Sequence, residues 1–255
     1  MRKSVLWGIF IVIIVGITGC TQAGDHDFSR QSAELSNQIA EDYDQAQALG
    51  SSLGLDAYLR SGNTGNLEGV SRQVLDYQAA HPEYRSLTLK ESQGTVLWST
   101  NTRRIGSRED QTFTFTRLSG HLMTFAGLEE QQGEPVMRVL NRSMDFEPMA
   151  FYGLWEVEVL LSDFDCAAQA VAQQGQIVYL LGNHNDALRW LPNGQKEWLA
   201  ATAAPAPIAA LGKTLSSTYL KEETGNCGYW EGLRYHEASY AAVPNVGWAV
   251  VVTDE

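Results

Sequence analysis

Residues 82–100, PEYRSLTLKESQGTVLWST, decide the fold that this sequence predicts. Leu87 and Leu89 alternate with polar residues, which is the pattern of a β-strand that buries one face. A turn signal follows at Gly94, and beyond it the alternation resumes and reaches Trp98. We therefore expect an antiparallel hairpin in this part of the chain.

Similar patterns continue beyond the hairpin. Apolar or alternating stretches predict further strands at 113–115, 123–125, 136–140 and 155–161. Together with the hairpin they predict one sheet of about five strands.

A second group of strands follows a helical stretch at 162–173. These strands are expected at 177–181, 188–191, 228–235, 238–243 and 248–252. The alanine- and proline-rich segment from Ala200 to Ala210 predicts a loop that enters a short helix. The pattern indicates a second, smaller sheet.

The residues before the hairpin have helical periodicity. Between Phe28 and Leu53 apolar residues recur in steps of three, four or seven. We expect one long helix from about residue 27 to residue 60, and a second helix over residues 67–80. The second helix should end before Pro82, because a residue that precedes proline is disfavoured in a helix. Helices followed by two antiparallel sheets with hairpin connections indicate the α+β class.

Four stretches of this sequence resemble an extracytoplasmic Cache (PAS-like) sensor domain. Residues 82–100 are similar to its first hairpin, and LWEVEVLLSDFD (154–165) to the strand that closes its first module. QIVYLLGNHNDALRWLP (176–192) resembles the opening hairpin of a second module, and YAAVPNVGWAVVV (240–252) resembles the closing pair of strands. The resemblance implies a double Cache domain over roughly residues 27–253.

The resemblance also implies a division of the chain, in which a long N-terminal helix precedes two PAS-like antiparallel-sheet modules. We expect a signal peptide (1–19), a tether (20–27), N-terminal helices (28–82), a membrane-distal module (83–165) and a membrane-proximal module (166–255).

The N-terminus has the pattern of an export signal. Arg2 and Lys3 precede an apolar run from Val5 to Ile17. A run of about 13 residues is short for a membrane span, which needs roughly 20. The four residues that end in Cys20 resemble a prokaryotic lipobox, which implies lipidation of this cysteine and a lipid anchor at the cell membrane. An uncleaved signal anchor is the alternative, and both place the later residues outside the cytoplasm.

Charge limits the classes of partner. The chain has 18 lysines and arginines against 30 acidic residues, a net charge of -12. Nucleic acid is therefore not an expected partner, because phosphate binding needs clustered cations. Residues 84–142 instead carry eight basic against six acidic residues. Arginines in such a module suit a pocket for a small anion, and a solvated face is the alternative.

The cysteines and histidines indicate no metal or cofactor. Cys166 and Cys227 are a candidate disulfide in an oxidising compartment, and two unpaired buried thiols are the alternative. The sequence has no Cys-x-x-Cys pair and no paired histidines at metal-ligand spacing.

Strand alternation predicts which side chains share a face. Val157 and Val159 should meet the long helix, which leaves Glu156 and Glu158 on the opposite face. In a Cache module that opposite face lines the ligand cavity. The candidate ligand-binding residues are Arg117, His121, Arg138 and Glu158, walled by Trp98, Tyr152 or Trp155.

The resemblance bears on the ligand as well. In the amino-acid-sensing branch of the family, an arginine beside aromatic residues binds the carboxylate, and an acid on the closing strand binds the amine. This sequence has no Arg-x-Trp-Tyr stretch to supply that arginine, and the acid on the closing strand would be Glu158. We therefore expect a small carboxylate or another polar metabolite.

The leading hypothesis is a membrane-tethered, extracytoplasmic small-molecule-binding protein of the sensor type, and not an enzyme. Most Cache receptors continue from the last strand into a membrane helix, whereas this sequence ends three residues after Val252, so we expect a sensor without an effector domain. The alternative is an envelope interaction module that docks on a separate receptor or transporter. A secreted hydrolase is a third class, because Gly50–Gly54 fits G-x-S-x-G, but no strand precedes that serine.

Overall fold

The structure is a computed structural model that describes residues 28–62, 65–109, 117–119, 122–182, 186–217 and 224–255. Its fold is α+β, as predicted. The helices are α1 (Phe28–Ser52), α2 (Leu55–Arg60), α3 (Leu67–Ala80), η1 (Thr102–Arg104), α4 (Ser162–Ala172), η2 (Ala201–Ala203) and α5 (Ala206–Ser217).

The strands form two large antiparallel sheets and one small hairpin. The first sheet has the order β2 (Val96–Ser99), β1 (Tyr84–Glu91), β6 (Met149–Leu160), β5 (Glu134–Phe146), β4 (Leu122–Gln131), β3 (Arg117–Ser119). The second has the order β10 (Thr224–Asn226), β13 (Ala238–Val243), β14 (Trp248–Asp254), β7 (Gln176–Leu181), β8 (Asp186–Trp190), β9 (Lys196–Ala200). β11 (Tyr229–Glu231) and β12 (Arg234–His236) form a separate hairpin.

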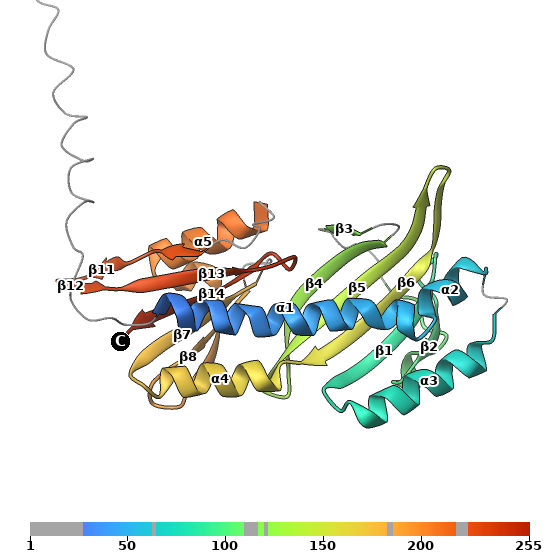
Figure 1. The fold of residues 1–255 in the computed structure, drawn as a ribbon, viewed down its shortest axis with the longest axis horizontal. Helices are drawn as coiled ribbons and strands as arrows, with labels where there is room; N and C mark the ends of the chain where they lie inside the picture. Colours follow the sequence, from blue (N-terminus) through green and yellow to red (C-terminus); the bar gives the residue numbers. More distant parts are fainter. Residues whose placement is uncertain (1–27, 63–64, 110–116, 120–121, 183–185, 218–223) are drawn as a thin grey trace, which may run out of the picture.

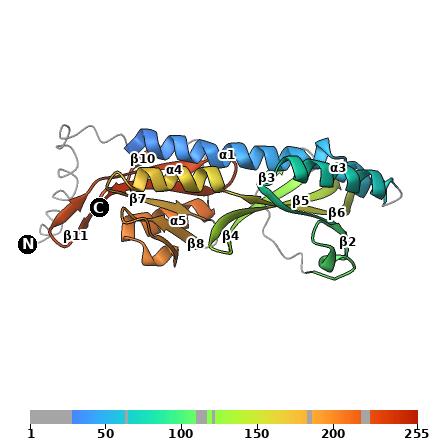
Figure 2. The same cartoon turned by 90° about the horizontal axis from the view of Figure 1, so that it is seen from below.

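Helix α1 runs along both sheets. Figure 1 shows it crossing the second sheet and then the first, and Figure 2 shows α1, α3 and α4 on one side of the sheets and α5 on the other. Its apolar stripe, which includes Leu35 and Ile39, belongs to one buried cluster with Val157 of the first sheet and Val250 of the second. A single hydrophobic core therefore joins the two sheets through this helix.

The predicted single helix over residues 27–60 is wrong, because the structure divides it into α1 and α2. Gly54 lies between them with a φ of +71°, in the left-handed region that a continuing helix does not use. The bend allows Leu55 and Leu59 of α2 to enter the core. Ser52 lies at the end of α1, exposed to solvent, so the G-x-S-x-G match has no strand-to-helix turn.

Several local predictions are confirmed. The first hairpin forms β1 and β2, with Leu89 opposite Trp98 and Gly94 at a φ of +91°. Helix α3 has the predicted bounds, and α4 covers the helical stretch expected after β6. The predicted strand at 113–115 lies outside the described residues.

The second sheet is larger than predicted, with six strands. Two strands were not predicted: β9, whose five residues KEWLA do not alternate between apolar and polar, and β10, which has only three residues. The single strand expected over 228–235 is instead the β11–β12 hairpin, because Gly232 adopts a φ of +61° and reverses the chain.

The contact between α1 and α4 predicts a pH-dependent stability. Burial raises the pKa of Asp42 on α1 to about 6, and Asp163 of α4 adds to this through charge repulsion. Because this pKa lies above the ordinary value of 3.8, the native state takes up a proton more readily than the unfolded state. The contribution of Asp42 to stability is therefore expected to be most favourable below about pH 4, and to be lost as the pH rises to about 6.

Asp42→Asn should remove this loss and raise the free energy of unfolding by about 2 kcal/mol at pH 7, with little gain at pH 4. Urea unfolding at both pH values measures the difference. Asp44→Asn, at an exposed position of the same helix, is the matched control and should change stability little. An equal gain at both pH values would contradict the electrostatic explanation.

Candidate ligand-binding site

The two faces of the first sheet differ in chemistry. Leu87, Leu89, Val157 and Val159 lie in the core that α1 covers, which confirms the predicted aliphatic face. Strand alternation turns the residues between them to the other face. These residues are Ser86, Thr88 and Lys90 of β1 and Glu156 and Glu158 of β6.

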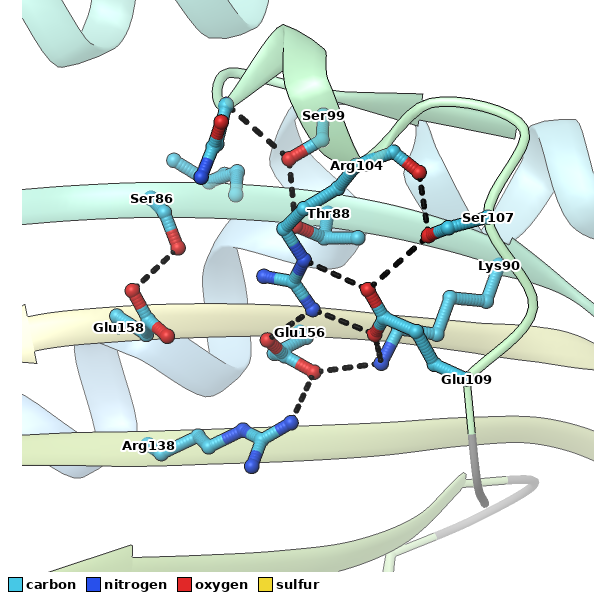
Figure 3. Close-up of polar contacts among 12 residues, drawn as sticks. Ser86, Thr88, Lys90, Ser99, Arg104, Ser107, Glu109, Arg138, Glu156 and Glu158 are labelled. Atoms are coloured by element: carbon cyan, nitrogen blue, oxygen red, sulfur yellow. Dashed lines mark hydrogen bonds and ion pairs between the residues drawn. The ribbon is translucent and has the colours of Figure 1, made fainter. Parts of the chain in front are cut away.

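Glu156 is the centre of a buried ion-pair network, which Figure 3 shows. Its carboxylate is 2.8 Å from Lys90 Nζ and 2.8 Å from Arg138 Nη2, and both Lys90 and Glu156 have fully buried side chains. Lys90 and Arg138 reach Glu156 diagonally from the strands on either side, since the residues directly opposite Glu156 are Thr88 and Leu140. Arg138 also lies 3.1 Å from Glu129.

Two further charged residues come from the segment between β2 and β3. Arg104 of η1 donates from Nη2 to the second oxygen of Glu156 at 3.0 Å. It also donates from Nε and Nη2 to the two oxygens of Glu109, at 2.8 and 2.7 Å. Lys90 Nζ lies 2.7 Å from the same Glu109 carboxylate. The side chain of Glu109 thus lies against Lys90 and Arg104, over the face that carries Glu156 (Figure 3).

Backbone hydrogen bonds fix the segment that carries Arg104 and Glu109. The Glu109 N–H donates to the carbonyl of Gly94 at 3.0 Å, and the Val96 N–H donates to the carbonyl of Ser107 at 2.9 Å. The first hairpin therefore sets the position of the Glu109 backbone, whereas the position of the Glu109 carboxylate depends on the rotamer of the side chain.

The charges keep both acids of the network ionised. Burial alone would raise the pKa of Glu156, but the charges and hydrogen bonds of Arg138 and Lys90 outweigh it, and the pKa lies below the usual range. The hydrogen bond from Arg104, helped by Lys90 and opposed by burial, lowers the pKa of Glu109 to about 2. Both side chains are carboxylates at neutral pH.

An apolar cluster adjoins the network on the same face. It consists of Phe125, Leu140 and Leu154 from three neighbouring strands. Leu140 is directly opposite Glu156, and Leu154 is directly opposite Lys90. The face therefore combines a buried network around a carboxylate with a buried apolar cluster beside it.

Two of the predicted site residues lie on this face. Arg138 binds Glu156 and Glu129, and Glu158, which is its cross-strand partner, accepts a hydrogen bond from Ser86 Oγ at 2.6 Å. Their use in ligand binding stays a prediction. Four residues of the network were not predicted as site residues: Lys90, Arg104, Glu109 and Glu156. Alternation from Leu87 and Leu89 does place Lys90 on this face.

The placement of Trp155 is corrected. Its side chain is fully buried in the core that α1 covers, and an ideal Cβ on Gly50 of α1 would lie 1.9 Å from its ring. Trp155 shares the parity of Val157 and Val159, so it cannot line the face that carries Glu156.

The other two predicted walls also lie apart from the network. Trp98 is half-buried against the core cluster, opposite Leu89. Tyr152 donates to Asp145 Oδ2 at 2.6 Å, and Arg60 lies over its ring at 4.8 Å from the centroid. Neither is therefore placed as predicted.

The remaining predicted ligand residues are not described fully enough to be placed. Arg117 begins β3 and pairs with Thr124 in register, but its side chain lies outside the described parts. His121 lies outside the described residues altogether.

The candidate disulfide is not formed, since Cys166 and Cys227 are free. Cys166 is exposed on α4, which packs on the face of the second sheet that α1 also covers. Cys227 contacts the smaller apolar cluster on the other face of this sheet, which includes Tyr179 of β7 and Ile208 of α5. The sheet separates the two thiols. Among the described residues, no group of three or more histidine, cysteine or acidic side chains is arranged to hold a metal ion.

A cavity of about 440 Å³ lies in the second module beside α5 and the β11–β12 hairpin. Its lining includes Tyr179, Tyr229, Trp230 and the cation of Arg189. The guanidinium of Arg189 is already 2.5 Å from Glu197. This cavity lacks the concentration of cations that the first sheet has.

Sequence comparison does not identify the family of this chain. No family model matches it, and no curated protein is similar to it in sequence.

Solved structures do resemble it. An extracellular ligand-binding receptor from Desulfohalobium retbaense matches 92% of this chain with a TM-score of 0.58 and 11% identity, although the chain spans only 41% of that receptor. The periplasmic sensory domain of the Campylobacter jejuni chemoreceptor Tlp1 matches 89% of this chain and 93% of its own length, with a TM-score of 0.56 and 14% identity. The ligand-binding domain of the Pseudomonas aeruginosa amino acid chemoreceptor PctC, in complex with GABA, matches 90% and 96%, with a TM-score of 0.51 and 12% identity.

These similarities identify the class of fold. The chain has the fold of the extracellular sensor domains of chemoreceptors and histidine kinases. More particularly, one long helix along two successive antiparallel sheets is the double Cache arrangement that the four sequence stretches resemble. Within the described part of the chain, every helix is too short or too polar to traverse a bilayer.

Proposed function

We propose that this chain is a membrane-tethered, extracytoplasmic sensor-type protein that binds a small carboxylate on the face of its first sheet that α1 does not cover. The observation that supports this most directly is the carboxylate of Glu109, which Arg104 binds with two hydrogen bonds and Lys90 contacts at 2.7 Å. Such a pair of cations is equally suited to the carboxylate of a ligand.

In this proposal the ligand carboxylate takes the place of the Glu109 carboxylate. Glu109 is 24% exposed, so a change of side-chain rotamer is enough to bring it into water. Without the Glu109 carboxylate, Glu156 would be the remaining acid of the network for both Lys90 and Arg104. Arg138 also pairs with Glu156. The apolar cluster of Phe125, Leu140 and Leu154 would contact the rest of the ligand.

The proposal of a membrane tether is based on the amino-acid sequence. We propose that residues 1–19 are a signal peptide and that Cys20 carries the lipid, with residues 20–27 as a tether. The helices (28–82) and the two modules (83–165 and 166–255) would then lie on the extracytoplasmic face of the cell membrane. The structural neighbours are sensory ligand-binding domains rather than enzymes, which supports a binding function. We propose that a separate receptor or transporter receives any signal.

Glu109→Gln should increase the affinity for small carboxylates about tenfold, because the internal competitor loses its charge. Calorimetric titration with acetate, pyruvate, succinate, GABA and glutamate measures the affinity. Arg104→Gln should lower the affinity of the same ligand at least about tenfold, since one charge-assisted bidentate contact is worth roughly 1.5–3 kcal/mol.

Arg103→Gln is the matched control, because Arg103 is the exposed neighbour of Arg104 in the same helical turn. It should leave the affinity unchanged. The proposal fails if no carboxylate binds either wild-type protein or Glu109→Gln. It also fails if Arg103→Gln and Arg104→Gln weaken binding equally, since surface charge alone would then explain it.

A further inference from the structure

The β11–β12 hairpin has two chemically different faces. Tyr229 and His236 are cross-strand partners, stacked at 5.0 Å between ring centroids, and both are buried against the second module. Trp230 and Tyr235 are the next pair, with ring centroids 5.4 Å apart, and side-chain alternation turns them to the opposite face. The inner pair thus fixes the hairpin on the module.

The outer face and the turn of this hairpin are exposed and apolar. Trp230 is 69% exposed, Leu233 at the turn is 99% exposed and Tyr235 is 49% exposed. These three residues, which we call the hairpin patch, are half of the six large hydrophobic residues that are exposed in the described part of the chain. Their concentration within six consecutive residues indicates a surface that is covered in the working protein.

The hairpin lies at the end of the molecule where α1 begins. Figure 1 shows β11 and β12 extending beyond the second sheet at this end, far from the first sheet, and Figure 2 shows β11 in the same place. The apolar run from Val5 to Ile17 and Cys20 precede Phe28 closely in sequence. Seven residues, 21–27, separate Cys20 from α1, and they span at most about 25 Å. A membrane attachment at Cys20 therefore holds this end of the domain near the bilayer.

We propose that the hairpin patch contacts the lipid surface, with Leu233 in the acyl region and Trp230 and Tyr235 at the level of the headgroups. This inference rests on the membrane tether of the proposed function. Tryptophan and tyrosine favour this interface because they combine an apolar ring with a polar group. A lipid surface is favoured over a protein partner by the short tether, which keeps the patch at a high effective concentration next to the membrane.

The hairpin would act as a second point of attachment to the membrane. Electrostatic attraction cannot supply this attachment. The full chain has a net charge of -12, and loss of Arg2 and Lys3 would make it more negative, so an anionic leaflet repels the protein. Glu231 and Arg234, which lie between the patch residues, are cross-strand partners of opposite charge. Apolar contact, in contrast, gains free energy in proportion to the area removed from water. Two attachments fix the orientation of the domain, whereas one leaves it free to rotate.

Tryptophan fluorescence in brominated vesicles tests this inference. Membrane-attached protein that carries Trp7→Phe, so that the apolar N-terminal run adds no tryptophan if it is retained, is reconstituted into phosphatidylethanolamine–phosphatidylglycerol vesicles with or without brominated acyl chains. Trp230 is the one exposed tryptophan among those the structure describes. We expect brominated lipid to quench the emission, Trp230→Phe to abolish most of this quenching, and Leu233→Ser to reduce it.

Trp198→Phe is the matched control, because Trp198 is a half-buried tryptophan of β9 in the same module, and it should leave the quenching unchanged. Protein that floats with the vesicles but shows no quenching overturns the hairpin contact and leaves the tether intact. Protein that does not float overturns the tether and, with it, the contact. A change in Trp230 emission with protein concentration in the absence of lipid overturns the inference in favour of a second copy of the chain. Carboxylate binding is measured separately and depends on neither result.

Discussion

Glu156→Gln is expected to lower the free energy of unfolding by about 3–5 kcal/mol, the largest effect predicted for this chain. The substitution keeps the shape of the side chain but removes the charge that Lys90, Arg104 and Arg138 share. Lys90 is fully buried, so its ammonium group would lose one of its two partners without gaining water. Urea unfolding, followed by circular dichroism, measures the change in the midpoint.

Glu158→Gln is the matched control for this substitution. Glu158 lies two residues away on the same face of β6, is half-buried and accepts a hydrogen bond from Ser86, so the expected loss is about 1 kcal/mol. Adding Lys90→Met to Glu156→Gln should recover part of the stability, because no ammonium group then remains buried. If Glu156→Gln costs no more than Glu158→Gln, the network is weaker than its geometry implies.

Gly50→Ala is expected to destabilise the protein by about 2–3 kcal/mol, although alanine is the better helix former by roughly 1 kcal/mol. An ideal Cβ at this position of α1 would lie 1.9, 2.2 and 2.6 Å from three atoms of the Trp155 indole. The ring is fully buried and rigid, so the clash has to be relieved by moving the helix or the sheet. Thermal and urea unfolding measure the loss.

Two variants separate the clash from other effects. Gly69→Ala in α3 should be nearly neutral, because an added Cβ would meet only the side chain of Asn66, the cap of an exposed first turn. Trp155→Phe should be costly alone but should cost less in the presence of Gly50→Ala, since the smaller ring leaves room for the methyl group. A gain in stability from Gly50→Ala would show that the helix and Trp155 are not in contact.

Local signals predicted the elements whose patterns are strong. The alternation around Gly94 gave the correct first hairpin, and the proline at 82 gave the correct end of α3. The break between α1 and α2 was missed because Gly54 is tolerated inside a helix, and only the packing of Leu55 and Leu59 favours the bend. Short strands such as β10 take their structure from their neighbour β13 rather than from their own residues.

The candidate site could be predicted only in part, because it depends on pairing between distant strands. Alternation within β6 separated Glu156 and Glu158 from Val157 and Val159 correctly, and the same rule should have placed Trp155 with the valines. The meeting of Lys90 with Glu156 depends on the register of β1 against β6, which no local pattern encodes. Glu109 follows a short helical turn and has no periodicity at all.

Helix α1 couples the stability of the two sheets. Its 25 residues form a rod of roughly 37 Å, and one continuous core joins it to Val157 at one end and to Val250 nearer the other. Neither sheet can lose its structure without exposing the stripe of the helix that the other also needs. We therefore expect the two modules to unfold as one cooperative unit, so that a molecule bound to the first sheet also protects the amides of the second sheet from hydrogen exchange by global unfolding.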